Sequence, residues 1–189
     1  MSGLTPQSRQ WFRLKFSSRE MEDNTEAQRL LDEHMTILDD VLNKSNFYNA
    51  VHSCYLELAF GQAALGIFPS GKTGVHFTPF TIGTYYLANG ADGNVDTFLR
   101  EYRMTARQLE EKFGRESLPI NLQNELELDS GSGTLHKVYW LVEKNPVYEE
   151  GKIDKFHMPY SSLYWMENSQ EDEWLEIGGF YEWPVPVGR

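Results

Sequence analysis

The hydrophobic pattern of the N-terminal third changes from an irregular stretch to a helical period. Residues 1–17 have no helical period, and from Trp11 onward apolar and polar positions alternate, which predicts an extended arm. Apolar residues then recur at three- and four-residue steps on both sides of Ser45. These positions are Leu31, Met35, Leu38, Leu42, Tyr48, Val51, Tyr55, Leu58 and Ala59. Residues 18–66 are therefore predicted to form a helical hairpin, whose second helix ends near Gly61 or Gly66.

Beyond Gly74 the chain becomes rich in β-branched and aromatic residues. This texture predicts strands over residues 75–80, 82–88 and 95–104, with the turn-forming residues 89–94 joining the last two. Thr105 and Gln108 form a capping-box pattern that opens a short helix, and Gly114 is expected to end that helix in a left-handed conformation. Residues 119–128 predict a further turn or two of helix.

The C-terminal part predicts an antiparallel meander over residues 134–183, with strands at residues 136–144, 155–165 and 174–182. Pro184 and Pro186 end the pattern, because a proline lacks the amide that a central strand needs. The fold class is therefore α+β: a helical hairpin followed by antiparallel β-strands with a short intervening helix, residues 75–128 holding the first strands and the short helices. The 189 residues predict a single domain spanning residues 1–189.

Composition excludes some classes of protein. The longest apolar stretches are broken by polar residues well short of the roughly 18 needed to span a bilayer, so we expect no membrane association. The N-terminus lacks the apolar core of a secretory signal. Cys54 is the single cysteine and cannot form an internal disulfide, which fits a reducing compartment.

The chain is strongly acidic, with 17 Lys/Arg against 28 Asp/Glu and a net charge of −11. Residues 116–189 hold 5 Lys/Arg against 14 Asp/Glu. An acidic surface repels phosphate backbones, so sequence-independent gripping of nucleic acid is not expected. The charge is compatible with lining a passage through which DNA slides.

Residues 66–73, Gly-Ile-Phe-Pro-Ser-Gly-Lys-Thr, satisfy the phosphate-loop pattern. That chemistry needs a buried strand before the loop and a helix starting at Lys72 and Thr73. Here the preceding segment, residues 54–64, is predicted to be helical and the following residues favour a strand. We therefore interpret the match as an exposed loop, and keep a nucleotide-binding enzyme as the alternative function.

No other pattern predicts a catalytic or metal site. The five histidines lack the spacing of zinc ligands, and Cys54 is interpreted as a small buried hydrophobe. A pair of catalytic carboxylates formed by tertiary contact stays open. We expect no cofactor, no metal and no enzyme activity.

Two groups of residues are candidate interaction sites. Arg100, Arg103 and Arg107 lie in the only basic concentration, and they are either a phosphate-contacting patch or, in the preferred interpretation, an ordinary surface balanced by nearby glutamates. Aromatic residues make up 14% of the chain, more than one small core needs, so some are expected at a subunit contact. Exposed tryptophans leave a carbohydrate-binding module as a third hypothesis.

Several segments, in order, resemble the head-to-tail connecting (portal) proteins of short-tailed bacteriophages. One of these segments is Ser-Asn-Phe-Tyr-Asn at residues 45–49. The full set lies at residues 3–6, 11–14, 45–49, 60–61, 63–65, 79–89, 96–109, 112–114 and 184–189. On two of these segments we expect a subunit interface that includes Trp11, Phe12, Asn46 and Phe47.

The resemblance implies a structural protein of the virion, made in the bacterial host cytoplasm or carried by a prophage. It implies a ring, a dodecamer in the full-length protein, at one capsid vertex, with capsid, packaging terminase and tail proteins as partners. DNA passes through such a ring without sequence-specific binding. The chain resembles the wing region, a fragment without stem and clip, so the isolated chain is expected to be a monomer or weak oligomer that does not bind duplex DNA.

Overall fold

The computed structural model describes residues 3–18, 24–127, 133–152, 154–167, 169 and 173–188. The chain groups into two compact units: unit 1 comprises residues 1–81 and 185–189, and unit 2 comprises residues 82–184. Two consecutive helices are followed by antiparallel strands with short helices between them, which confirms the predicted α+β class. The assignment of all residues to one wing-like domain stays a prediction.

Unit 1 begins with the arm, whose described residues 3–18 form no helix or strand. Helix α2 spans Thr25–Lys44 and is capped by Asn24, whose side chain accepts hydrogen bonds from the amides of Glu26 and Ala27. Helix α3 spans Phe47–Leu58 after a two-residue link. The predicted pair of helices is therefore present, and the second helix ends near Gly61 rather than Gly66.

The sheet of unit 1 corrects the predicted helical character of residues 59–66. Strand β1 spans Ala63–Ser70 and pairs antiparallel with β2, Gly74–Phe80. Strand β8, Val187–Gly188, pairs on the other side of β1, and the sheet order is β2-β1-β8. The alanines and leucine at residues 63–65 favour a helix by themselves, but the ladder with β2 decides their conformation.

Unit 2 is built on a five-stranded antiparallel sheet with the order β3-β4-β5-β6-β7. Its strands are β3 Tyr85–Asn89, β4 Val95–Thr105, β5 Leu135–Lys144, β6 Tyr160–Met166 and β7 Glu176–Phe180. The meander and the hairpin at residues 89–94 are as predicted, except that β6 begins at Tyr160 rather than Lys155. Residues 145–152 and 154–159 therefore lie outside the sheet, in the connection between β5 and β6.

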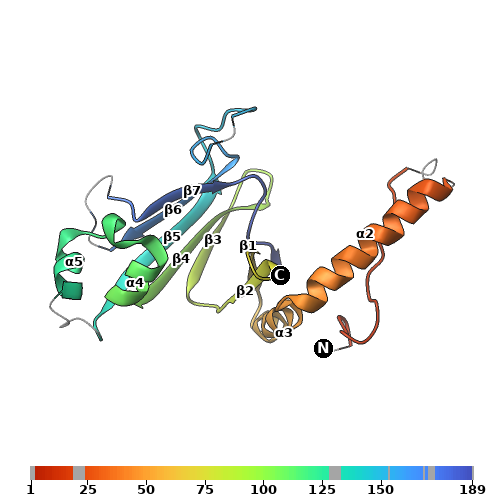
Figure 1. The fold of residues 1–189 in the computed structure, drawn as a ribbon, viewed down its shortest axis with the longest axis horizontal. Helices are drawn as coiled ribbons and strands as arrows, with labels where there is room; N and C mark the ends of the chain where they lie inside the picture. The colour runs from red at the N-terminus through yellow and green to blue at the C-terminus, as the bar shows by residue number, and fades with distance from the viewer. Residues whose placement is uncertain are drawn as a thin grey trace. The chain divides into compact units, whose positions relative to one another are not determined.

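Within the described residues, three short helical segments lie between β4 and β5 in unit 2. They are α4 Ala106–Phe113, the 3-10 turn η1 Arg115–Ser117 and α5 Ile120–Glu127. Leu109, Leu118 and Leu122 from these segments pack on Val138 of the sheet, so the helices cover one face of it, as Figure 1 shows. The capping box of Thr105 and Gln108 is present.

Gly114 ends α4 with a φ of 80° and a ψ of 152°. The positive φ was predicted, but this ψ lies outside the left-handed helical region and in a conformation that is essentially confined to glycine.

Candidate functional site

The residues predicted at a subunit interface come together in unit 1. Trp11 from the arm stacks on Phe47 of α3 with ring centroids 6.0 Å apart, and Phe12 lies edge-on to Trp11. Phe47 in turn contacts Phe77 of β2 with centroids 5.1 Å apart. The cluster encloses the buried side chains of Leu42, Ala50 and Phe77, so these aromatic residues contribute to the fold of unit 1.

Asn46 connects the start of α3 to β2. Its side-chain nitrogen, Nδ2, donates a hydrogen bond to the backbone carbonyl oxygen of Phe77 at 2.6 Å. Its side-chain oxygen, Oδ1, accepts a hydrogen bond from the backbone amide of Phe77 at 2.9 Å. Both backbone groups of Phe77 are thereby satisfied by one side chain. Trp11, Phe12, Asn46 and Phe47 are all half-buried, and their role at a subunit interface stays a prediction.

The three arginines predicted to contact phosphate are not presented alike. Arg100 and Arg103 lie on β4 an odd number of residues apart, so their side chains leave opposite faces of the sheet. Arg100 is half-buried, with its guanidinium 4.6 Å from the centre of the Tyr102 ring, and burial lowers its pKa. Arg103 and Arg107 are exposed. A phosphate-contacting role for the three stays a prediction.

Lys112, another member of this basic segment, packs against aromatic rings. Lys112 is classed among the exposed residues, yet its ammonium group lies 4.2 Å from the Tyr164 ring centre and donates a hydrogen bond to the Tyr102 hydroxyl at 3.0 Å. Burial of the ammonium group lowers the pKa of Lys112 to about 8. Burial also raises the pKa of Tyr102 to about 12 and raises the pKa of Tyr164.

The phosphate-loop match forms a β-hairpin turn. Residues 66–70 lie in β1, residues 71–73 form the turn, and β2 begins at Gly74, paired with Ser70. The Lys72 amide donates to the Ser70 hydroxyl at 3.4 Å, and the Thr73 hydroxyl donates to the Val75 carbonyl at 2.7 Å. The expected helix before the loop is replaced at residues 63–64 by β1. Because β2 follows the turn, no helix N-terminus faces a phosphate at this position.

The tryptophans divide between core and surface. Trp140 is buried, Trp11, Trp165 and Trp183 are half-buried, and Trp174 is 37% exposed. Trp165 stacks on Tyr139 and contacts Trp174 edge-on. Aromatic residues beyond the core are therefore spread over both units, from Phe60 in unit 1 to Tyr86 and Trp174 in unit 2.

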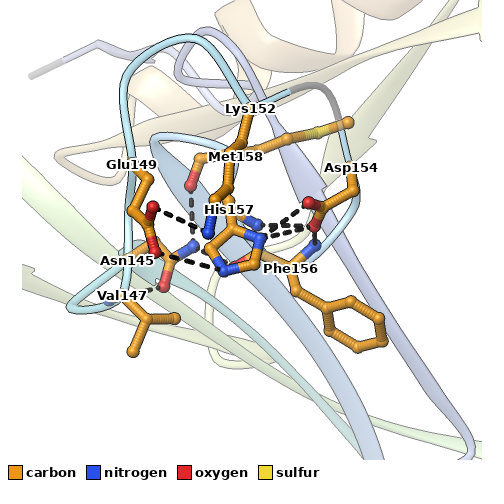
Figure 2. A network of polar contacts seen from close by, with 8 residues as sticks. All are labelled: Asn145, Val147, Glu149, Lys152, Asp154, Phe156, His157 and Met158. Carbon is orange, nitrogen blue, oxygen red and sulfur yellow. Dashed lines mark hydrogen bonds and ion pairs between the residues drawn. The ribbon is translucent and has the colours of Figure 1, made fainter.

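The loop of residues 145–159, between β5 and β6, contains a compact polar network that the sequence analysis did not single out (Figure 2). The Asn145 side-chain nitrogen donates to the carbonyl oxygens of Phe156 at 2.7 Å and Met158 at 2.8 Å. The Asn145 amide donates to the Pro159 carbonyl at 2.9 Å. One asparagine thereby closes the base of a 15-residue connection. Asn145 before Pro146, and Pro159 before β6, were the available turn signals.

His157 lies at the centre of this network in Figure 2. Its Nδ1 is 2.7 Å from an Asp154 carboxylate oxygen, and its Nε2 is 3.7 Å from Glu149, which also pairs with Lys152 at 2.7 Å. The hydrogen bond with His157 lowers the pKa of Asp154, and the Phe156 amide adds to this effect. The network therefore joins side chains of residues 145–152 to residues 154–158.

Within the described residues, no three His, Cys, Asp or Glu side chains group so that they could hold a metal ion. Cys54 is buried, and burial raises the pKa of its thiol. None of the helices in the described part of the chain combines the length and apolar character that crossing a bilayer requires.

Comparison with known proteins identifies the family. The family model described as "Bacteriophage head to tail connecting protein" matches residues 1–189. The chain is 32% identical over 190 residues to the "Portal protein" of Salmonella phage epsilon15, an alignment covering 100% of this chain and 34% of that protein. It is 28% identical over 184 residues to the "Probable portal protein" of Bordetella phage BPP-1, covering 95% of this chain and 32% of that protein.

The chain thus spans about a third of the length of the curated relatives it matches. The family match covers both units and every segment on which the sequence resemblance was based. This chain belongs to the family of bacteriophage head to tail connecting proteins.

Proposed function

We propose that this chain forms part of the wall of a phage portal, the ring at one capsid vertex through which DNA is packaged and later ejected. The observation that carries the proposal is the family match over residues 1–189, together with relatives named as portal proteins in two phages. The role is structural, and the chain has no catalytic centre of its own.

The proposal extends to the whole protein of which such a chain is part. That protein forms a ring of twelve copies and contacts the capsid, the packaging terminase and the tail proteins. It is located in the virion, and in the host cytoplasm during assembly. DNA passes through the ring without sequence-specific binding.

The acidic charge of the chain favours a surface past which DNA moves over a surface that binds DNA. The net charge is −11, and the basic residues of the Arg100–Arg115 segment are largely engaged within the chain. Arg100 and Lys112 lie against aromatic rings, and Arg115 pairs with Glu127 at 2.7 Å. These contacts occupy part of the basic surface of this segment, and the excess of acidic residues over the whole chain opposes contact with a DNA backbone.

The experiment that tests this function is gold labelling of virions. Antibody fragments raised against the chain are bound to particles of the phage that encodes it and located by electron microscopy. The proposal expects label at a single vertex, where head and tail join. Label on all vertices, or along the tail only, would contradict it.

The nucleotide-binding alternative is tested separately by thermal unfolding with and without MgATP. A bound nucleotide at 100 times its dissociation constant stabilises a protein by about 2.7 kcal/mol. Because residues 66–73 form a hairpin turn, we expect no change in melting temperature.

A further inference from the structure

A pocket of about 480 Å³ lies within unit 2, lined by the end of α4, strand β7 and the connection between β5 and β6. Trp174 and Phe156 belong to its lining and are 37% and 49% exposed, so they offer uncovered aromatic surface. Pockets of about 300–1,000 Å³ with an apolar lining and a few polar groups are typical sites for small organic molecules. Most of the lining here is apolar, and its apolar residues are Phe113, Phe156, Trp174, Leu175 and Ile177.

The polar lining includes two lysines, Lys112 and Lys155. Lys112 follows the buried Leu109 of α4 by three residues, so helical spacing places both side chains on the side that faces the sheet. Its ammonium group lies 4.2 Å from the centre of the Tyr164 ring. The ammonium group of Lys155 lies 5.0 Å from the centre of the Phe156 ring. Both charges are therefore held beside aromatic rings at the pocket.

These two lysines have no acidic partner within the chain. Among the residues that the structure describes, neither forms an ion pair with a carboxylate. This holds although residues 82–184 contain 9 Lys/Arg against 19 Asp/Glu. Glu176, which pairs with Tyr164 in the β6–β7 ladder, is the acidic residue of the lining. The lining therefore carries an excess of positive charge within an acidic unit.

The surroundings of Lys112 disfavour its charged form. Burial lowers its pKa to about 8, because burial outweighs the attraction of Glu176, and Arg100 adds to the lowering. Tyr102 and Tyr164 supply no negative charge near neutral pH, since burial raises the pKa of both hydroxyls. An anion that reaches this ammonium group would stabilise its protonated form, and the protonated form would in turn favour binding of the anion.

We propose that this pocket binds a small organic acid. Its carboxylate contacts the ammonium groups of Lys112 and Lys155, with which it forms charge-assisted hydrogen bonds. Its apolar part lies against Phe156 and Trp174 and covers their exposed rings. Because Glu176 repels a second negative charge, a carboxylate is preferred to a phosphate dianion. This site is additional to the proposed structural function and does not depend on it.

Binding of phenylacetate, a carboxylate attached to one aromatic ring, tests the site. The tryptophans of the full chain are labelled with ¹⁵N, and their indole N–H resonances are followed by NMR at about pH 7. The Trp174 resonance, assigned with Trp174→Phe, should shift and saturate with a dissociation constant on the order of 1 mM, as expected for so small a ligand. Trp11 lies in unit 1, so its resonance should stay in place. A Trp174 resonance that does not shift and saturate would overturn the proposal.

Two analogues separate the contribution of charge from that of the ring. Phenylacetamide keeps the ring and lacks the charge, whereas acetate keeps the charge and lacks the ring. Each should bind at least about fivefold more weakly than phenylacetate. Equal binding of phenylacetamide would show that the lysines play no part, and equal binding of acetate would show that the rings play none. Either result would overturn the proposal.

Lys112→Met and Lys155→Met test the two lysines separately. Each substitution removes one positive charge and keeps a flexible apolar side chain, so phenylacetate should bind about three- to tenfold more weakly. Lys72→Met is the matched control, because the exposed Lys72 lies in the hairpin turn of unit 1, and it should bind phenylacetate as the parent does. Parent affinity in either pocket variant would overturn the assigned contacts.

The affinity should also depend on pH through Lys112. The carboxylate of the probe stays ionised between about pH 7 and 9, whereas Lys112 loses its proton with a pKa of about 8. Binding by the parent should therefore weaken about tenfold across this range, and Lys112→Met should abolish the dependence. The same affinity of the parent at both ends of the range would overturn the assignment of Lys112.

Discussion

The two units build their cores from different kinds of contact. In unit 2, Tyr85, Phe98, Trp140 and Tyr164 form a column of rings across four strands adjacent in the sheet. In unit 1, the arm, the start of α3 and β2 meet at Trp11, Phe47 and Phe77, and β8 returns to β1 from the other end of the sequence. Unit 2 is thus stabilised by packing between consecutive strands, whereas unit 1 depends on a few contacts between distant segments.

The largest effect is expected from Trp140→Ala in the ring column of unit 2. Trp140 is 2% exposed, and its indole N–H donates to the Ser162 hydroxyl at 2.9 Å. Removing the ring leaves a cavity between Phe98 and Tyr164, so the free energy of unfolding should fall by about 3–5 kcal/mol. Urea denaturation measures it, with the exposed Tyr86→Ala as control. A loss no larger than that of the control would show that the column does not hold unit 2 together.

Asn46→Ala tests whether a single polar side chain matters as much in unit 1. It leaves the amide and carbonyl of the buried Phe77 without these two hydrogen bonds, at a cost of about 1–3 kcal/mol. Hydrogen exchange of the peptide containing Phe77 should become faster. Asn43→Ala is the control, because the exposed Asn43 bonds only within α2. Equal exchange in the two variants would contradict the connecting role of Asn46.

Gly114→Val should destabilise the protein by about 1–3 kcal/mol, because its φ of 80° and ψ of 152° suit glycine alone. The effect is confined to the end of α4 in unit 2. The midpoint of chemical denaturation provides the measurement. An unchanged midpoint would mean that the backbone adopts another conformation at this position.

Lys112 gives unit 2 a dependence on pH. Its folded-state pKa of about 8 lies below the ordinary value of 10.5, so above pH 8 the folded protein binds fewer protons than the unfolded chain. The free energy of unfolding should therefore rise between pH 8 and about 9.5, with a small slope because the side chain is partly open to water. The raised pKa values of Tyr102 and Tyr164 act in the opposite direction only at higher pH.

Lys112→Met should remove this part of the slope, since methionine does not titrate. Urea denaturation of parent and variant across the same pH range provides the comparison, in which all other titrating groups cancel. Parallel curves would show that the ammonium group is fully hydrated in the folded state.

The smallest effect is expected from Lys72→Ala in the hairpin turn of unit 1. Lys72 is exposed, and a surface change away from special features alters stability by less than about 0.5 kcal/mol. Thermal unfolding with and without MgATP should give the same result for parent and variant. An ATP-dependent property that the substitution abolishes would contradict the structural role.

The difference between the units also explains which parts of the fold the sequence predicts. Strands β3 to β7 pair with their neighbours in chain order, so alternation and turn residues were sufficient to find them. β1 and β8 could not be predicted. Residues 63–66 become a strand only because β2 is available, and Val187 pairs with Ala64, more than a hundred residues away.

The candidate sites show the same limit. Arg100, Arg103 and Arg107 are close in sequence, but a strand places alternate residues on opposite faces, and the chain enters α4 at Ala106. Spacing therefore could not indicate one patch. The hydrogen bonds of Asn46 to Phe77 and of Asn145 to Phe156 and Met158 join distant or irregular segments, for which the sequence carries no periodic signal.

The central claim is that this chain forms part of a wall past which DNA moves without being bound. The most direct test is a titration of the chain with duplex DNA at about 150 mM salt. Light scattering follows the oligomeric state in the same samples. The net charge of −11 predicts no sub-micromolar binding. Contacts of this chain alone are expected to bury less than the roughly 1,000 Å² that a stable interface needs, which predicts a monomer or weak oligomer. Sub-micromolar binding that weakens steeply with added salt would contradict this role, because the chain would then hold the DNA that is proposed to pass it.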